Sequence, residues 1–148
     1  MNALTYTESA AGITEAQFKN LPCGWPKSPS AKTVLKSLKA MNARILAIDA
    51  STGQVAGYAC GMTDGVLILY VWDVEVPPEY AGQGVELELL RRLIEVVGDI
   101  YQINANPDDR LRPIFQQLGF VAYRSDQATA MTKMRMDLQD GGSRATMS

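Results

Sequence analysis

The first third of the chain has the apolar spacing and breaker residues of two short helices. Thr14 can cap a short helix at "ITEAQF", and the three prolines and one glycine of "LPCGWPKSPS" then break the chain into a loop. Ser30 is placed to cap a second helix in "AKTVLKSLKAMN", because apolar residues recur at helical spacing from Val34 to Met41 and the lysines take the other side. We therefore expect two helices before residue 43.

After residue 42 the pattern changes to that of a sheet. The segments "ARILAIDA", "QVAGYACGMT" and "VLILYVWDVEV" read as strands, and the short turns "STG" and "DG" separate them. This order predicts an antiparallel meander. The third segment, Val66 to Val76, is almost wholly apolar until Asp73 and Glu75, so we expect it to be the central strand and buried on both faces at its start.

A longer amphipathic helix is predicted from Val85 to Val97. Its apolar residues form one stripe, and Glu88 and Arg92 lie four residues apart on the polar side, where they can form an ion pair. The strand "DIYQINA" follows, and "NPDD" then leads into a helix through "RLRPIFQQL" that Gly119 ends and in which Pro113 implies a late start or a kink. The segments "FVAYR" and "AMTKMRM" are expected to complete the sheet.

Length and composition indicate one globular domain. The chain has 148 residues, of which 47% are hydrophobic and 20% charged. It has no run near the ~18 apolar residues that a membrane helix needs. We expect a domain over residues 1–139 and a disordered tail at residues 140–148, where "DGGSRATMS" is rich in Gly and Ser. The start "MNALTYTESAAG" lacks the pattern of a secretion signal, which favours a cytoplasmic protein without a membrane partner.

Charge and rare residues exclude several classes of function. The formal net charge is -2 and the basic residues are scattered, so the patch typical of nucleic-acid binders is missing. The chain has no histidine, which excludes histidine triads and most zinc sites, and we expect no metal. Cys23 and Cys60 could form one bridge, but without an export signal we expect reduced structural thiols. A general base must then be a carboxylate, a tyrosinate, a lysine or a bound water.

Two longer motifs resemble the GCN5-related N-acetyltransferase (GNAT) family. The segment "VEVPPEYAGQGVELELLRRL" is similar to that family's central strand, pyrophosphate loop and following helix, and "RPIFQQLGF" resembles its ending in an aromatic residue, a spacer and Gly-Phe. With the order of strands, the likeness covers roughly residues 43 to 136. It implies an α+β fold of α/β type, in which helices flank a mixed, mostly antiparallel sheet that is splayed between strands 4 and 5. Acetyl-coenzyme A would lie in that gap.

The glycine turn before the long helix has the chemistry to hold a phosphate. Gly82 and Gly84 let backbone N–H groups approach an anion at the helix amino terminus, which carries about half a positive charge and needs no basic side chain. The resemblance implies that the cofactor is bound along the central strand, the turn and the opposite wall of the gap. The residues concerned are Val74, Glu75, Val76, Ala81, Gly82, Gln83, Gly84, Val85, Glu86, Asn104, Asp108 and Phe115.

Three positions depart from the family pattern. Ala81 stands where the family has Arg or Gln, and losing an exposed ion pair costs only ~0 to 1 kcal/mol. Glu86 replaces Gly or Ala, and its charge within ~4 Å of a phosphate would add about 4 kcal/mol of repulsion, but we expect it to point to solvent and to support the helix dipole. Phe115 stands in the place of the family's catalytic tyrosine and has no proton to give, so the thiolate would leave without that acid.

Asp73 and Glu75 are the candidate bases for an amine acceptor. They lie two residues apart on a strand and share a face, and a carboxylate whose pKa is raised by burial can take the amine proton through a water. The resemblance puts Glu75 closest to the acetyl group, although both acids could simply mark the solvated end of a strand. Asp108 can cap the last helix, and Trp25 can line an acceptor pocket or anchor a loop.

Two functions stay open. The first is transfer of an acetyl group from acetyl-coenzyme A to a primary amine of a small molecule or a protein. The alternative is a catalytically weak or silent member that binds an acyl-coenzyme A or another ligand as a sensor or partner subunit. Ala81, Glu86 and Phe115 favour the alternative, whereas the intact turn at residues 82–84 favours the enzyme. An exposed strand edge could also join two copies in a homodimer.

Overall fold

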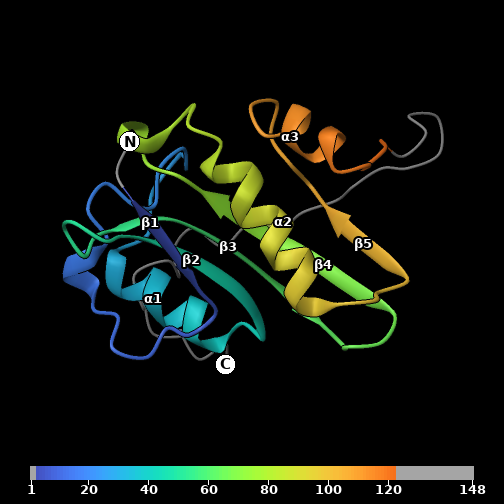
Figure 1. The fold of residues 1–148 in the computed structure, drawn as a ribbon, viewed down its shortest axis with the longest axis horizontal. Coiled ribbons are helices and arrows are strands. Elements are labelled where there is room, and N and C mark those ends of the chain that lie inside the picture. The colour runs from blue at the N-terminus through green and yellow to red at the C-terminus, as the bar shows by residue number, and fades with distance from the viewer. Residues whose placement is uncertain (1–2, 123–148) are drawn as a thin grey trace, which may run out of the picture.

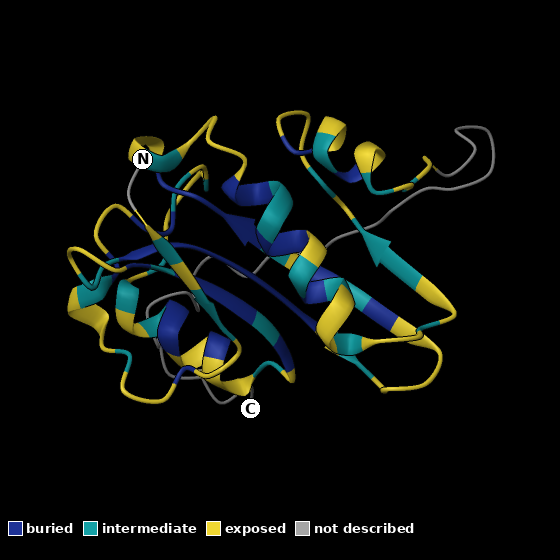
Figure 2. Ribbon diagram, in the orientation of Figure 1, coloured by how far each residue is buried: buried dark blue, intermediate teal, exposed yellow. Residues whose placement is uncertain are grey.

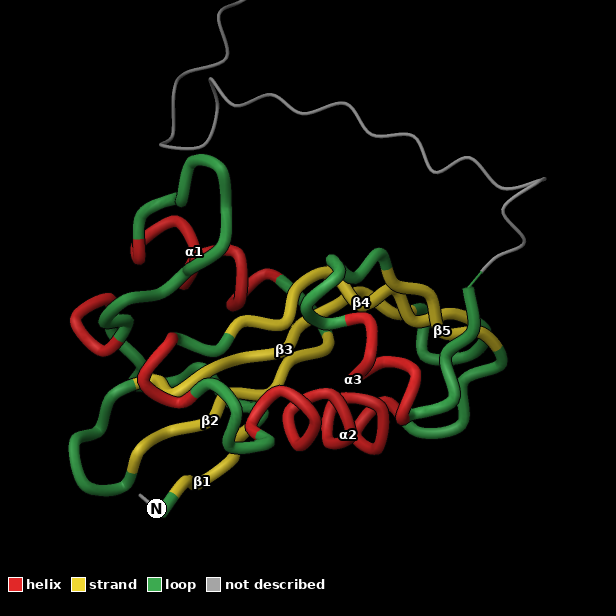
Figure 3. The backbone as a smooth tube through the Cα atoms, turned by 90° about the horizontal axis from the view of Figure 1, so that it is seen from above, coloured by secondary structure: helices red, strands yellow, loops and turns green. Residues whose placement is uncertain are grey.

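The computed structural model describes residues 3–122, and these form one mixed sheet with helices on both faces (Figure 1). The strands are β1 (Leu4–Thr7), β2 (Ala43–Asp49), β3 (Val55–Thr63), β4 (Ile68–Glu75) and β5 (Gln102–Ala105). The helices are α1 (Ala31–Ala40), α2 (Val85–Val97) and α3 (Arg112–Gln117), with 3₁₀ turns η1 (Glu15–Gln17) and η2 (Pro78–Tyr80). Figure 3 shows α1 and α2 on opposite sides of the sheet, which confirms the predicted fold class. Residues 120–122 of the predicted strand "FVAYR" are described and are not in a strand, so this part of the prediction is wrong; residues 123–124, all of "AMTKMRM" and the predicted tail lie outside the described residues.

The helix ends lie where the sequence predicts them. The N–H of Thr33 donates to Oγ of Ser30 at 3.2 Å, so Ser30 caps α1. The third helix begins only at Arg112, with Pro113 in its first turn, where the missing N–H of proline costs no hydrogen bond. Gly119 follows it with a left-handed φ of 85°.

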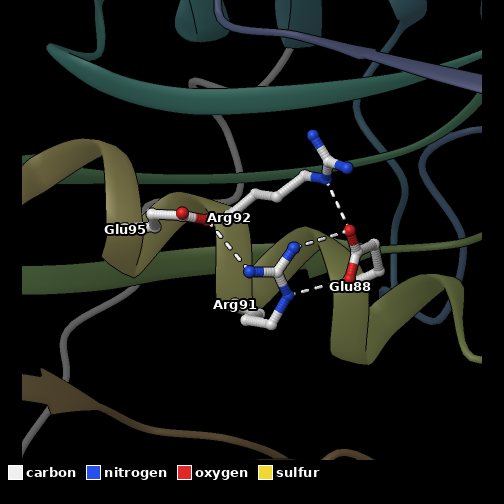
Figure 4. A network of polar contacts seen from close by, with 4 residues as sticks. All are labelled: Glu88, Arg91, Arg92 and Glu95. Carbon is white, nitrogen blue, oxygen red and sulfur yellow. Dashed lines mark hydrogen bonds and ion pairs between the residues drawn. The ribbon is translucent and has the colours of Figure 1, made fainter.

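The polar side of α2 carries a charge network that includes the predicted pair of Glu88 and Arg92 (Figure 4). Nε of Arg92 lies 2.6 Å from Oε1 of Glu88, and Arg91 pairs with both Glu88 and Glu95 at 2.9 Å. Hydrogen bonds from Arg91, and then from Arg92, hold the pKa of Glu88 down at about 2. These exposed pairs add little stability. The guanidinium of Arg92 also lies over the ring of Tyr6 on β1, 4.4 Å from its centroid.

The sheet order is β1-β2-β3-β4-β5, with antiparallel pairing up to β4. The hairpins that join β2, β3 and β4 confirm the predicted meander. The edge strand β1, which pairs Leu4 with Asp49, was not predicted. Four residues of partly polar sequence are too few to separate a strand from a loop by periodicity, and only the pairing with β2 makes this segment a strand.

The expectation of a central strand at Val66–Val76 that is buried from its start is wrong. The middle strand of the described sheet is β3, and β4 begins at Ile68 with Val66 67% exposed and Leu67 55% exposed. The carboxylate of Asp64 accepts the N–H groups of residues 66–68 and holds them in a turn. Burial of β4 begins only at Leu69, where the core under α2 starts.

Each face of the sheet has its own core, and Figure 2 shows the buried residues concentrated in the strands and on the inner sides of the helices. The core under α2 contains Leu69, Val71 and Val74 of β4, Val76 directly after it, Leu89, Leu90 and Leu93 of α2, and Leu111 and Phe115 from the α3 region. The core under α1 contains Val34, Leu35, Leu38, Leu46, Tyr58 and Cys60. The two cores fix both helices against the sheet.

The strands β4 and β5 part where β4 carries its acids. They run parallel and pair from Ile68 with Gln102 as far as Val71 with Ala105, and β4 then continues to Glu75 without β5. This confirms the predicted splay. A bulge leaves Trp72 without a partner on β3 and pairs Asp73 with Cys60. Because directly opposite residues share a face, the carboxylates of β4 lie on the same side of the sheet as the core under α1.

Candidate active site

A cleft of about 190 Å³ lies where β4 and β5 part. Its walls are the end of β4, the connection between β5 and α3, and the loop at residues 23–26. Six residues with a predicted role in the site line this cleft: Trp25, Asp73, Val74, Glu75, Asp108 and Phe115. The cleft therefore combines carboxylates with aromatic and apolar walls.

Asp73 is half-buried and has the environment of an acid–base group. Oη of Tyr58 donates to Oδ2 of Asp73 at 3.1 Å. Burial, and then the charge of Glu75, raise the pKa of Asp73 to about 7, and the bond from Tyr58 opposes this only in part. Near neutral pH the carboxyl is therefore divided between its two forms and can both accept and release a proton.

Glu75 has a different set of partners. It is 4% exposed. The N–H and the Sγ–H of Cys23 donate to its Oε2 at 3.2 and 3.0 Å, and Nε1–H of Trp25 donates to its Oε1 at 2.9 Å. Both carboxylate oxygens are thus occupied by the loop at residues 23–26. Trp25, for which two roles stayed open, both lines the cleft and anchors its loop.

The cysteines are free, as predicted. Burial and the hydrogen bond to Glu75 raise the pKa of Cys23 to about 12, and burial raises the pKa of Cys60 to about 12 as well. Both groups are thiols at neutral pH. Since the thiolate is the reactive form, neither cysteine is activated as a nucleophile.

The glycine turn leads directly into α2. Gly82 and Gly84 have φ of 74° and 79°, and Gly84 is the N-cap of the helix. A Cβ at either position would meet nothing within 4 Å, so the left-handed backbone, and not lack of space, requires glycine there. The turn is fastened from its amino side, where Oη of Tyr80 donates to Oδ2 of the buried Asp49 at 2.7 Å.

The prediction that Glu86 points to solvent is wrong. Glu86 is 6% exposed, and its Oε1 lies 3.7 Å from Nη1 of Arg110 in the connection between β5 and α3. The reason lies in helical geometry, because residues 86, 89, 90 and 93 fall on one side of a helix and the last three belong to the core. The polar character of Glu86 hid this position, which its spacing alone would have assigned to the inner face.

The remaining predicted residues are divided between the cleft and its surroundings. Oδ1 of Asp108 accepts the N–H of Leu111 at 2.9 Å, so Asp108 caps the turn that leads into α3 and not the helix itself, whose N-cap is Leu111. Asn104 lines a second hollow, of about 870 Å³ between β5 and α3, which adjoins the cleft at residues 105–107 and Phe115 and does not include Asp73. Phe115 is buried and lies edge-on to the ring of Phe120, with centroids 5.0 Å apart.

Two residues of the site were not found from the sequence. Tyr58 reaches Asp73 only because of the strand register, and Arg110 reaches Glu86 only because the loop after β5 folds towards α2. Neither contact leaves a periodic signal in the sequence. Among residues 3–122, no helix is long and apolar enough to cross a membrane.

The family model of the GNAT acetyltransferases matches residues 11–120 of this chain, and the chain belongs to that family. A curated relative, the chloroplastic GCN5-related N-acetyltransferase 2 of Arabidopsis thaliana, is 28% identical over 118 residues. That match takes in 67% of this chain and 46% of the relative. The chain thus spans about half the length of this relative.

Solved structures agree with this assignment. A candidate acetyltransferase from Deinococcus radiodurans R1 is 30% identical and superposes with a TM-score of 0.81 over 93% of this chain and 92% of that one. A GNAT family protein from Streptococcus pneumoniae TIGR4 is 19% identical, with a TM-score of 0.69 over 92% and 99% of the two chains. Glucosamine-6-phosphate N-acetyltransferase from Arabidopsis thaliana is 8% identical, with a TM-score of 0.64 over 89% and 98%. The last two share the fold alone.

Proposed function

We propose that this protein transfers an acetyl group from acetyl-coenzyme A to a primary amine of a small molecule or a protein. The observation that carries the proposal is the environment of Asp73, whose pKa is raised to about 7 in the cleft between the parted strands. The glycine turn at the start of α2 supplies backbone N–H groups for the diphosphate of the cofactor.

In the proposed reaction Asp73 accepts a proton from the ammonium form of the acceptor, directly or through one water. The neutral amine nitrogen then forms a bond to the thioester carbon, the bond from that carbon to sulfur breaks, and the nitrogen releases its surplus proton to solvent to leave a neutral amide. Coenzyme A leaves as a thiolate and takes its proton from solvent, because Phe115 offers none. Coenzyme A thiolate is a better leaving group than an alkoxide, so this last step does not need a protein acid.

The charges of the cleft fit an amine acceptor. Among residues 3–122, its lining includes the acids Asp73, Glu75 and Asp108 and one basic side chain, that of Arg110. This excess of acid attracts a protonated amine and repels an anionic acceptor. The indoles of Trp25 and Trp72 add flat surfaces on which a cationic group can rest.

A second function is favoured by two observations. The carboxylate of Glu86 is buried in the first turn of α2, where the cofactor diphosphate would lie, and Phe115 lacks the hydroxyl of the family's catalytic tyrosine. Both would suit a module that binds an acyl-coenzyme A or another ligand without turning it over.

The test is product formation from acetyl-coenzyme A and a panel of primary amines, followed by mass spectrometry of the acetylated amine. We expect Asp73→Asn to lower kcat by about 10²-fold or more and Glu75→Gln to lower it less. Asp109→Asn, in a 94% exposed side chain outside the cleft, is the matched control and should change nothing.

Each result has a separate meaning. Loss of activity in Glu75→Gln but not in Asp73→Asn would make Glu75 the base. Binding of coenzyme A without acetylation of any amine would favour the second function. Absence of both binding and product would reject acetyl transfer altogether.

A further inference from the structure

The ion pair between Glu86 and Arg110 joins the two walls between which the cofactor of the proposed function would pass. Glu86 belongs to the first turn of α2, directly after the glycine turn, and Arg110 belongs to the connection between β5 and α3. Arg110 also lines the acceptor cleft. A single guanidinium therefore faces both the anion-binding end of the helix and the cleft that contains Asp73.

The two partners are unequally exposed. The side chain of Glu86 is 8% exposed and that of Arg110 is 49% exposed. The carboxylate is fixed by the packing of α2, and a buried carboxylate that loses its partner is strongly destabilised. The arginine has room to adjust its position while it remains next to Glu86.

The separation of the pair leaves donors of the guanidinium available. Nη1 of Arg110 lies 3.7 Å from Oε1 of Glu86, which is an ion pair and longer than a normal hydrogen bond. A guanidinium has five N–H donors in a planar fork, which suits two anions at once. Charge compensation of Glu86 therefore does not use up the capacity to bind a phosphate oxygen.

Other cations are not positioned for this task. The family has Arg or Gln at the start of the turn, and Ala81 offers no such group. Arg91 and Arg92 are paired with Glu88 (Figure 4), and the guanidinium of Arg92 also lies over the ring of Tyr6 on β1. In the described part of the chain, the cation paired with the buried acid Glu86 is Arg110.

We propose that Arg110 is the residue that allows this turn to bind a diphosphate, because its guanidinium neutralises Glu86 and binds a phosphate oxygen of coenzyme A. The inference rests on the proposed function and explains how a turn next to a buried acid can bind the diphosphate that this function requires. With Arg110 present, the charges of the pair cancel, and the backbone N–H groups act on the diphosphate. Without it, a buried negative charge faces the ligand.

The test is isothermal titration of the full chain with coenzyme A, with four variants. Arg110→Gln should weaken binding by about 100-fold, because it removes a phosphate contact and exposes the ligand to Glu86. In the Glu86→Gln background the same change should weaken binding by only about 10-fold, because the repulsion is then absent. Arg112→Gln is the control, since Arg112 is 58% exposed and pairs with Asp109 in the same connection, and it should leave affinity unchanged.

Dephospho-coenzyme A distinguishes the phosphates, because it keeps the diphosphate and lacks the 3′-phosphate. The loss caused by Arg110→Gln should be the same for both ligands. Disappearance of the loss with dephospho-coenzyme A would overturn the diphosphate assignment. Melting curves without ligand identify any variant that has failed to fold. If Arg110→Gln does not fold, Arg110→Lys takes its place in the titrations. Lysine keeps the charge and loses the planar fork of the guanidinium, so this variant should retain part of the affinity for coenzyme A.

This inference would be overturned if Arg110→Gln weakened coenzyme A binding equally in the wild-type and Glu86→Gln backgrounds, or no more than Arg112→Gln does. The proposed function would still stand. If the wild-type chain binds neither ligand, the proposed function fails, and this inference fails with it. The two failures are therefore distinguishable in one set of titrations.

Discussion

The two carboxylates at the end of β4 lie two residues apart and differ in their partners. Glu75 accepts hydrogen bonds from Cys23 and Trp25 on both of its oxygens, which gives it a part in holding one wall of the cleft. Asp73 accepts one from Tyr58 and has a raised pKa. The hydrogen bonds favour Asp73 as the group that exchanges a proton with an acceptor.

The raised pKa of Asp73 makes stability depend on pH. Its pKa is about 7 in the folded protein, against an unfolded value of about 3.9. The folded state therefore binds the proton more tightly, and the stability from this group is fully present below about pH 4 and lost as pH rises through about 7. We expect urea denaturation to show that Asp73→Asn loses less stability than wild type between pH 5 and pH 8.

Asp109→Asn is the matched control for that experiment, since its side chain is 94% exposed. It should follow the wild-type pH dependence. If Asp73→Asn loses as much stability as the wild type between pH 5 and pH 8, another group titrates in this range.

Among the elements, β3 and its neighbours are packed closely because of a glycine. A Cβ at Gly57 would lie 2.8 Å from the carbonyl oxygen of Glu75 and 3.0 Å from Cδ1 of Leu89. The first contact is with the backbone of β4 and the second with α2. Gly57 therefore sets how near both elements come to β3, directly behind the carboxylates of the cleft.

We expect Gly57→Ala to lower the free energy of unfolding by about 3 kcal/mol, since backbone atoms cannot yield cheaply to an added methyl group. Gly12→Ala is the control, because a Cβ there meets nothing within 4 Å and only its φ of 75° is unfavourable. That variant should lose about 1 kcal/mol. Chemical denaturation measures the free energy of unfolding of both variants. Equal losses of stability would mean that β4 and α2 relax around the added methyl group.

At the scale of the whole molecule, the cofactor would contact elements that the chain brings together from distant positions. The end of β4, the turn before α2 and the connection before α3 all border the proposed path of the cofactor. A ligand that binds this arrangement and not the unfolded chain stabilises the fold by mass action. Binding is thus measurable without a known acceptor.

With coenzyme A at a hundredfold excess over its dissociation constant, stability should rise by about 2.7 kcal/mol. For a chain of this length the melting temperature should rise by roughly 5 to 10 °C. ATP at the same concentration is the control, because it offers phosphates without the pantetheine arm, and it should shift the temperature less. No shift with coenzyme A would count against acetyl transfer.

Features that depend on neighbours along the chain were predictable from the sequence. The bounds of α2, the cap at Ser30, the late start of α3 before Pro113 and the stop at Gly119 follow from spacing, capping and backbone preferences within a few residues. The glycine turn belongs with them, because φ is a local property. The splay and the place of the cofactor came from resemblance to a family.

The site itself depended on contacts between distant residues. The partners of Glu75 lie 50 and 52 positions away in the sequence, and Tyr58 lies 15 away from Asp73. The burial of Glu86, its pairing with Arg110 and the strand at β1 likewise exist only after the elements have packed. Local sequence determined which segments are helices and turns. Tertiary structure decided which charges face each other, because pairing and desolvation are set by the register of strands and the approach of loops.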